Sequence, residues 1–212
     1  MDTKLIFVRH GQSLANTEKF FAGHIDVPLT DIGLRQAEKM ADFLKSFPIS
    51  AIYSSDLIRC TETARPIASH FGIDFIRDAR LREVHAGIWQ KKGFDFLNAS
   101  ADYKVWRTCT TDFRPEGGEN MRDLWERVYA SVAEILEKHK GETVAIVTHA
   151  TPIRVLKTGW VGVPLSSLSQ IDSPQNASIT VVNYKENGKA EITLDSENSF
   201  LGALSAAPTT QM

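Results

Sequence analysis

Leu5-Ile6-Phe7-Val8-Arg9-His10-Gly11 is the stretch that decides the expected fold. Its four apolar residues in a row are typical of a strand that is buried on both faces, as strands are in a parallel sheet. The strand runs directly into the charged triplet Arg9-His10-Gly11. Because ligands bind beyond the carboxyl ends of the strands in open α/β sheets, this triplet is expected to face a functional crevice.

A second strand of the same kind lies in the C-terminal half of the chain. Residues 143–147 form an apolar run that ends in Thr148-His149. Helices are expected around the two strands, because apolar residues recur at spacings of three and four over 30–44 and 122–140. Strands that alternate with helices favour a three-layer α/β/α fold with a mostly parallel central sheet. The residues that follow the two strands should then meet at one edge of the sheet.

The remaining segments fit the same architecture. Short strands are expected at 51–53 and 73–76, a helix at 59–71, and a hairpin of 178–184 and 190–194 around Asn187-Gly188. Aromatic residues gather between Trp89 and Trp106, which suggests a small helical cap inserted at about residues 84–116. A single domain of residues 1–195 is expected to be followed by a loosely ordered tail, 196–212, rich in Ser, Ala and Thr.

Composition and charge narrow the class of protein. The 212 residues carry a formal net charge of −2, and the charged residues are scattered and form no runs. This pattern counts against a nucleic-acid partner, and no stretch approaches the ~20 apolar residues of a membrane span. No signal peptide is evident, and Cys60 and Cys109 are too few for a disulfide framework. We therefore expect a cytoplasmic protein with no membrane contact.

The residues at the strand ends suit a phosphoryl group. Arg59, which follows a third strand end, adds a second guanidinium to Arg9, and arginine forks match phosphate oxygens in a bidentate way. A neutral imidazole can attack phosphorus and hold the phosphoryl group, which divides one difficult displacement into two. His10 is the candidate nucleophile, because Gly11 should let the backbone turn sharply and approach the phosphate closely.

Six ordered motifs resemble the histidine phosphatase superfamily, which includes the cofactor-dependent phosphoglycerate mutases. They span nearly the whole chain and comprise Arg9-His10-Gly11 with Asn16, Gly23-His24-Ile25-Asp26 with Leu29-Thr30 and Gly33, Tyr53-Ser54-Ser55-Asp56-Leu57 with Arg59, Thr63 and Ala64, Leu81-Arg82-Glu83 with Gly87 and Trp89, Gly117-Gly118-Glu119 with Arg127, and Val147-Thr148-His149 with Arg154. An Arg-His-Gly triplet alone would be weak evidence, but six motifs at family spacing are a strong signal.

The resemblance implies a role for each matching residue. It makes His10 the nucleophile, and it makes Arg9, Arg59 and His149 the positively charged pocket around the phosphoryl group. Glu83 takes the position of the proton donor, which protonates the leaving alcohol and later activates water. The residues expected to bind the phosphate or the rest of the substrate are Asn16, Gly11, His24, His85, Thr148 and Ala150.

No metal or other cofactor is expected, because no His-x-x-x-His or clustered carboxylate spacing appears in the chain. Arg127, on the helix expected at 122–140, is taken by default to be solvated. The chain departs from many relatives after Glu83, since Trp89-Gln90-Lys91 stands where they have Trp-Glu-Gly. This change alters the rim of the expected pocket and argues against copying a substrate from a relative.

The favoured hypothesis is a metal-independent phosphatase for a small phosphorylated metabolite. α-Ribazole phosphate, phosphoserine and a sugar or glycerate phosphate all remain open as substrates. A phosphoglycerate mutase is less favoured, because mutases of this family carry a much longer insertion than residues 84–115. A non-catalytic phosphate-binding module ranks last, since every expected catalytic position is filled. The choice between a monomer and a homodimer also stays open.

Overall fold

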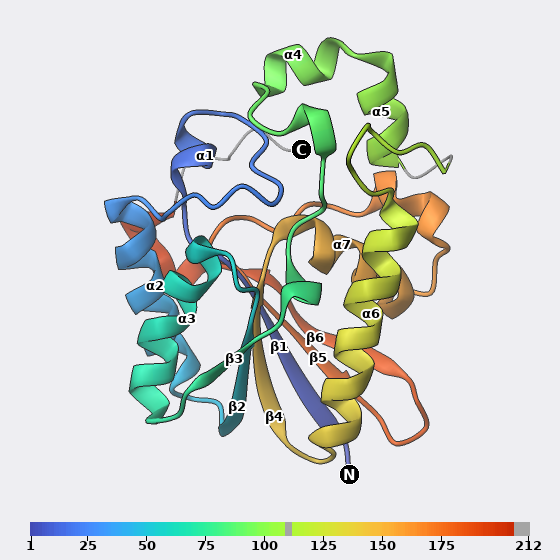
Figure 1. Ribbon diagram of the computed structural model, residues 1–212. Helices are drawn as coiled ribbons and strands as arrows, with labels where there is room; N and C mark the ends of the chain where they lie inside the picture. Colours follow the sequence, from blue (N-terminus) through green and yellow to red (C-terminus); the bar gives the residue numbers. More distant parts are fainter. Residues whose placement is uncertain (109–111, 206–212) are drawn as a thin grey trace.

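The computed structural model describes residues 1–108 and 112–205, and it places a six-stranded sheet between two layers of helices (Figure 1). The strands are β1 (Thr3–Arg9), β2 (Ile49–Ser54), β3 (Phe75–Arg77), β4 (Thr143–Thr148), β5 (Ile179–Tyr184) and β6 (Ala190–Glu197). Their order across the sheet is β3-β2-β4-β1-β5-β6, with β3, β2, β4 and β1 parallel, β5 antiparallel to β1, and β6 antiparallel to β5. The expected α/β fold with a mostly parallel sheet is confirmed.

Strands β1 and β4 form the centre of the sheet. The four apolar residues of β1 are fully buried, and every residue of β4 is buried, which explains why both read as continuous apolar runs. Arg9 pairs with Thr148 in the parallel register between the two strands. His10 and His149 therefore leave the sheet side by side at its carboxyl edge.

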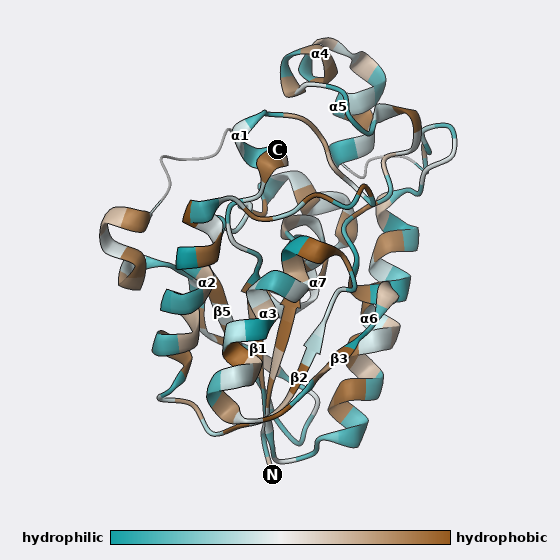
Figure 2. Cartoon of the chain, turned by 60° about the vertical axis from the view of Figure 1, so that its left-hand side comes forward, coloured by the Kyte–Doolittle hydropathy of each residue, from teal (hydrophilic) through white to brown (hydrophobic). Residues whose placement is uncertain are grey.

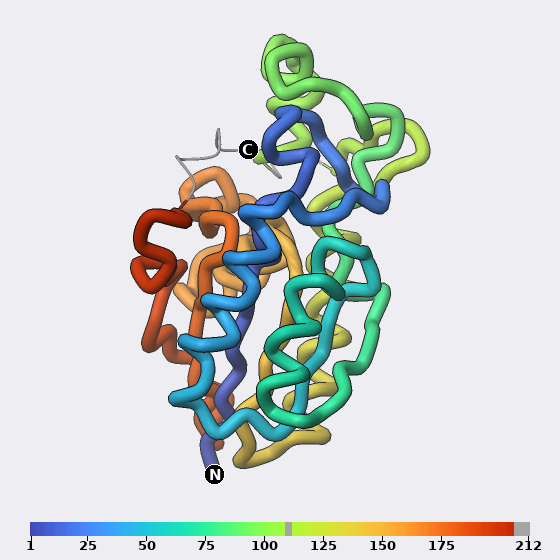
Figure 3. The backbone as a smooth tube through the Cα atoms, turned by 90° about the vertical axis from the view of Figure 1, so that its left-hand side faces the viewer, coloured from blue at the N-terminus to red at the C-terminus, as the bar shows by residue number. Residues whose placement is uncertain are grey.

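Helices cover both faces of the sheet. They are α1 (Leu14–Thr17), α2 (Asp31–Leu44), α3 (Ile58–Phe71), α4 (Phe94–Ala99), α5 (Ala101–Thr108), α6 (Met121–Lys138) and α7 (Ala150–Trp160), with short 3₁₀ segments η1 (Ala79–Leu81), η2 (Gly87–Trp89), η3 (Leu165–Gln170) and η4 (Ser199–Leu204). Figure 3 shows α2 and α3 together on one face. Among the residues that the structure describes, no helix has the length and apolar character needed to cross a membrane.

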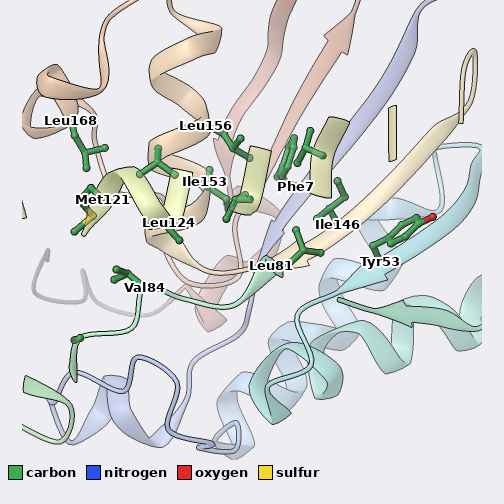
Figure 4. Packing of buried hydrophobic residues seen from close by; sticks show 14 of the residues in the cluster. Phe7, Tyr53, Leu81, Val84, Met121, Leu124, Ile146, Ile153, Leu156 and Leu168 are labelled. Atoms are coloured by element: carbon green, nitrogen blue, oxygen red, sulfur yellow. The ribbon is translucent and has the colours of Figure 1, made fainter. Parts of the chain in front are cut away.

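Each face of the sheet has its own hydrophobic core. Helices α2 and α3 pack Met40 and Ile67 against Ile6 of β1. Helices α6 and α7 pack Leu124 and Ile153 on the opposite face, in a core that also contains Phe7 (Figure 4). Figure 2 shows hydrophobic residues along β1 and mixed stripes on the helices around it, as expected of amphipathic helices.

The cap lies over the carboxyl edge of the sheet and consists of η2, α4 and α5 (Figure 1). Its side chains Trp89, Tyr103 and Trp106 pack edge to face against one another or against Phe21 of the main body. All four are at most 8% exposed, and they extend the core of the α6–α7 face beneath the cap helices. This core holds the cap against the loop that carries Phe21.

The C-terminal boundary differs from the one expected at residue 195. Strand β6 continues to Glu197, and η4 then packs beside α2 (Figure 3). Leu201 is buried, Phe200 stacks on Phe43 with ring centroids 4.6 Å apart, and Gln36 donates from Nε2 to the Leu204 carbonyl at 2.8 Å. The expected loose tail is therefore wrong for residues 196–204, because apolar residues in this polar stretch complete the core. Residues 206–212 lie outside the described part of the chain.

Candidate active site

His10 is held at the end of β1 by hydrogen bonds to the backbone. Its N–H donates to the Thr148 carbonyl at 3.1 Å, and its Nδ1 lies 2.7 Å from the Gly11 carbonyl. A carbonyl only accepts, so Nδ1 carries the proton and Nε2 keeps its lone pair. Burial, together with the charges of Arg59 and Arg9, holds the pKa of His10 well below its ordinary value. His10 is thus a neutral imidazole in the form that can attack phosphorus.

A small cavity of about 40 Å³ lies beside His10. This volume suits a few water molecules or one small oxyanion, since a single water needs about 10–15 Å³ of such space. The residues that line it are Arg9, His10, Ser13, Ala15, Asn16, Phe20, Phe21, Ala22, Gly23, Arg59, Glu83 and Phe94. The fold therefore brings together five of the residues expected from the sequence.

Two buried guanidinium groups supply the positive charge of the cavity. Arg59, in the first turn of α3, donates to the carbonyls of Gly23 (2.8 Å) and Ile25 (3.0 Å) and to Nδ1 of His149 (3.2 Å). Arg9 donates to the Pro174 carbonyl, and its Nε has no partner among the described residues. Burial lowers the pKa of Arg9 to about 10, so it stays charged at neutral pH. Each guanidinium thus keeps N–H groups for a phosphate.

His149 occupies the N-cap position of α7, directly behind the two guanidinium groups. Its Nδ1 accepts from Arg59, and its Nε2 lies 2.8 Å from Oγ of Ser55, so the proton sits on Nε2. Burial and the nearby Arg59 charge hold the pKa of His149 well below its ordinary value. His149 is neutral here, so the expectation that it adds positive charge is wrong. It orients Arg59 and packs against His10 at 5.2 Å between ring centroids.

Glu83 enters the cavity from the loop after η1. Its Oε1 accepts from the N–H of Val84 at 2.7 Å, and its Oε2 accepts from the N–H of Thr151 at 3.3 Å, in the first turn of α7. The side chain is 5% exposed and lines the same cavity as His10. The structure therefore brings Glu83 to the same cavity as His10, and its role as the proton donor stays a prediction.

Comparison with known proteins identifies the family of this chain. A model of the histidine phosphatase superfamily, branch 1, matches residues 5–196. The chain belongs to this superfamily. It is 40% identical over 160 residues to phosphoglycerate mutase-like protein 4 of Arabidopsis thaliana, an alignment that covers 72% of this chain and 69% of the relative.

Solved structures agree with this assignment of the family. YhfR of Bacillus stearothermophilus superposes with a TM-score of 0.87 at 29% identity, covering 94% of this chain and 99% of that one. A mycobacterial glucosyl-3-phosphoglycerate phosphatase superposes with a TM-score of 0.85 at 26% identity, covering 93% of this chain and 100% of that one. The relatives and solved structures include a probable phosphoglycerate mutase of Salmonella choleraesuis and a phosphatase, so the chain is assigned to phosphoryl transfer.

Arg127 has a different role from the one expected from the sequence. Its Nε and Nη2 donate to the two carboxylate oxygens of Glu119 at 3.0 and 2.5 Å. Its remaining donors reach the carbonyls of Arg80 (2.7 Å), Arg82 (2.8 Å) and Glu83 (2.8 Å). All five N–H groups of the guanidinium are used, so the expected solvated role is wrong. The pairing of Glu119 with Arg127 in one family motif was the available signal.

Gly11 is required by close packing and not by a sharp turn. Its φ is not positive, but a Cβ at this position would lie 2.6 Å from the carbonyl oxygen of Gly33. The Gly11 N–H also donates to Oγ1 of Thr63 at 3.1 Å. The close approach that requires a glycine here is to Gly33, and the expected approach to the phosphate stays a prediction. The glycine lets the His10 loop pack against the first turn of α2.

Asn16 lines the cavity and has a fixed orientation. Its Oδ1 accepts from the N–H of Ser13 at 2.9 Å and from Nδ2 of Asn176 at 3.1 Å. Asn176, which the sequence did not single out, also reaches the His10 carbonyl at 3.4 Å. Since the Oδ1 of Asn16 is used by the protein, its Nδ2 is the group that can donate to a ligand.

Four other expected residues support the site without lining the cavity. The Thr148 hydroxyl donates to the Leu81 carbonyl at 2.7 Å, so it holds η1 against β4. Ala150 is the first residue of α7, where backbone N–H groups have no partner within the helix. His24 and His85 stack edge to face at 4.6 Å beneath Glu83.

His24 supports the backbone of the acid loop. Its Nε2 donates to the Glu83 carbonyl at 2.7 Å, and burial lowers the pKa of His24 to about 4. Gln90, the departure noted in the sequence, accepts from the N–H of His24 at 2.7 Å. Within the described ranges, no three His, Cys, Asp or Glu side chains gather closely enough to bind a metal ion.

Proposed function

We propose that this histidine phosphatase is a metal-independent phosphohydrolase that acts on a small phosphomonoester through a phosphohistidine on His10. The observation that carries the proposal is the state of His10, whose Nδ1 is tied to the Gly11 carbonyl while Nε2 keeps its lone pair. The neighbouring Arg9 and Arg59 provide fixed positive charge beside it. Its partner is a small metabolite, and neither nucleic acid nor a membrane takes part.

In the first step, Nε2 of His10 attacks phosphorus while the bond to the leaving oxygen breaks. Arg9 and Arg59 stabilise the charge on the equatorial oxygens, and Nδ2 of Asn16 adds a further donor. Glu83 gives its proton to the leaving oxygen, so the product is a neutral alcohol. Nδ1 of His10 keeps its proton, and its bond to the Gly11 carbonyl stabilises the phosphorylated ring.

In the second step, water replaces His10 on phosphorus. The Glu83 carboxylate takes a proton from the attacking water, and the phosphorus–nitrogen bond breaks to release inorganic phosphate. His10 returns to its neutral form. The first turn of α7, which begins at Ala150, adds the positive end of a helix dipole to the same pocket.

The small cap favours a hydrolase over a mutase. A mutase must keep water from the phosphohistidine until the phosphoryl group returns to the substrate, and among the described residues the cap over the pocket consists of the short segments η2, α4 and α5. The mutase remains the second candidate, because a relative with 34% identity is named a probable phosphoglycerate mutase. The two differ in one measurable respect, which is whether water accepts the phosphoryl group.

One experiment tests both the intermediate and the reaction. The protein is incubated briefly with ³²P-labelled substrate and quenched without acid, and the label is expected on His10 as an acid-labile adduct. A parallel panel of phosphomonoesters, with and without 2,3-bisphosphoglycerate and with EDTA, is expected to release inorganic phosphate under all conditions. Label on another residue, loss of activity on chelation, or conversion of 3-phosphoglycerate to 2-phosphoglycerate in place of phosphate release would reject the proposal.

A further inference from the structure

A second cavity, of about 320 Å³, lies between the cap helix α5 and the segment that follows α7. It is separate from the cavity beside His10, since the two share no lining residue. Its lining comprises Lys104, Arg107, Thr108, Arg154, Ser169, Ile171, Asp172 and Ser173. Three of these side chains are cationic and one is acidic.

Arg154 forms the buried wall of this cavity. Its residue is 7% exposed, with Nε donating to the Ile171 carbonyl at 3.0 Å and Nη2 donating to the Leu168 carbonyl at 2.8 Å. These two bonds use two of its five N–H groups, and Nη1 donates to no described residue. No nitrogen of Arg154 is among the buried polar atoms that lack a partner in the described residues, so its remaining N–H groups are accessible to an acceptor on the cavity side.

The other charges around the cavity do not supply that acceptor. Lys104 and Arg107 are three residues apart on α5, so they share a face of that helix and point positive charge at the same space. Asp172 is exposed, and none of the ion pairs among the described residues joins it to Lys104, Arg107 or Arg154. The positive charge of Arg107 also lowers the pKa of Arg154, after the larger effect of burial.

The cavity is structurally connected to the catalytic site. Asp172 and Ser173 line it, while the next residue, Pro174, accepts a hydrogen bond from Arg9. Arg154 follows His149 by five residues in α7, which corresponds to a rise of about 7.5 Å along the helix axis. A ligand in this cavity would therefore touch the same short segment that orients a catalytic guanidinium.

We propose that the cavity formed by Arg154, Lys104 and Arg107 is a second anion-binding site, which takes a carboxylate or phosphate group. Its guanidinium donors match the paired oxygens of such a group, and the two α5 cations add charge at the rim. The anion comes either from a second acidic group on the substrate or from a free small molecule. The binding site is the same in both cases, and the proposal adds to the proposed function without replacing it.

The test uses the double variant Lys104→Gln/Arg107→Gln. Both side chains project from one helix and reach solvent, so the variant removes two charges with little effect on folding. Arg122→Gln/Lys138→Gln is the matched control, because it removes the same charges from the exposed face of α6. Thermal melting of all three proteins verifies that the fold is retained.

Two measurements distinguish the sources of the anion. The first compares kcat/KM for 3-phosphoglycerate and glycerol 3-phosphate, which differ in the carboxylate. The second titrates citrate by calorimetry into protein whose catalytic cavity is filled with vanadate. If the anion is a second acidic group on the substrate, the double variant is expected to lose about tenfold in kcat/KM for 3-phosphoglycerate but not for glycerol 3-phosphate. This is the effect of losing one charge-assisted hydrogen bond. If the anion is a free small molecule, citrate is expected to bind about tenfold more weakly to the double variant and with unchanged affinity to the control.

The proposal is overturned if the double variant matches the wild type in both measurements, or if the α6 control changes as much as the variant. Either result would leave the proposed function intact, because p-nitrophenyl phosphate hydrolysis and the label on His10 do not depend on this cavity. Failure to label His10 in the wild type would instead reject the proposed function and leave citrate binding to be judged separately.

Discussion

The proposed nucleophile, His10, and the proposed acid, Glu83, line one cavity but are held there by two different parts of the fold. His10 and His149 leave adjacent parallel strands, and hydrogen bonds to neighbouring backbone or to Arg59 hold them in place. Glu83 lies on the loop between η1 and η2. Hydrogen bonds from the side chains of His24 and Arg127 to the Glu83 carbonyl hold this loop in place. The comparison indicates that the sheet positions the proposed nucleophile, whereas the proposed proton donor depends on hydrogen bonds from outside the sheet.

The largest effect on turnover is expected for His10, the residue that follows strand β1. His10→Asn removes the attacking nitrogen, so turnover of every phosphomonoester should fall by on the order of 10⁴-fold or more, as for loss of other covalent nucleophiles. Steady-state hydrolysis and ³²P labelling measure the change. His70→Asn, an exposed histidine on α3, is the control and should retain wild-type rates. Substantial label or turnover in His10→Asn would mean that another residue carries the phosphoryl group.

Glu83→Gln tests the proposed acid directly. An alkoxide leaves badly without a proton, so hydrolysis of alkyl phosphates should fall by about 10²- to 10⁴-fold. p-Nitrophenolate needs no proton, so its release in the first turnover should change much less, and a burst followed by slow dephosphorylation should appear. Rapid-quench kinetics with both substrate types gives the answer. An equally slow burst on p-nitrophenyl phosphate would show that Glu83 is not the general acid.

Arg127→Lys tests the hydrogen bonds that hold the Glu83 loop. Lysine keeps the positive charge, but it lacks the several guanidinium N–H groups that bond Glu119 and the carbonyls of the Glu83 loop at the same time. The Glu83 side chain should therefore be less well positioned. We expect kcat for alkyl phosphates to fall by about tenfold with KM little changed, while the p-nitrophenyl burst is less affected. Arg122→Lys, one and a half turns earlier on α6, is the control. A uniform loss on both substrate types would indicate a general structural defect.

The smallest effect concerns stability against acid. The pKa of His24 is lowered to about 4 in the folded protein, so between its ordinary value of 6.5 and about 4 the unfolded chain binds more protons. Stability should fall as the pH falls through this window. In His24→Gln, the glutamine can still donate a hydrogen bond to the Glu83 carbonyl but has no group that titrates in this range. The melting temperature of this variant should therefore change less over the same pH range. His70→Gln is the control, and an unchanged pH slope in His24→Gln would contradict the assignment.

The predictable part of this protein lies where the pattern is local. The apolar run of β1 predicted a buried strand and placed His10 at its end, and Asn187-Gly188 marked the turn between β5 and β6. The helix expected at 122–140 is α6, at Met121–Lys138. These elements can be predicted from the sequence because the pattern of a strand or helix is set by residues that are neighbours in the chain. The resemblance to the family then supplied Glu83, whose loop has no periodic signal.

Only the tertiary structure decided what these residues contact. The neutral state of His149 follows from its burial against Arg59, and the need for Gly11 follows from the approach of Gly33. From the sequence alone, Arg127 is expected to be a charged residue on the surface of a helix. In the folded protein, three carbonyls of a distant loop accept hydrogen bonds from it. Protonation, close packing and side-chain donors depend on groups that are far apart in the chain, so no local pattern contains them. The sequence by itself predicted the main strands and helices and indicated His10 as the nucleophile, and the packing of the loops onto these elements determined how Glu83, the proposed acid, is held.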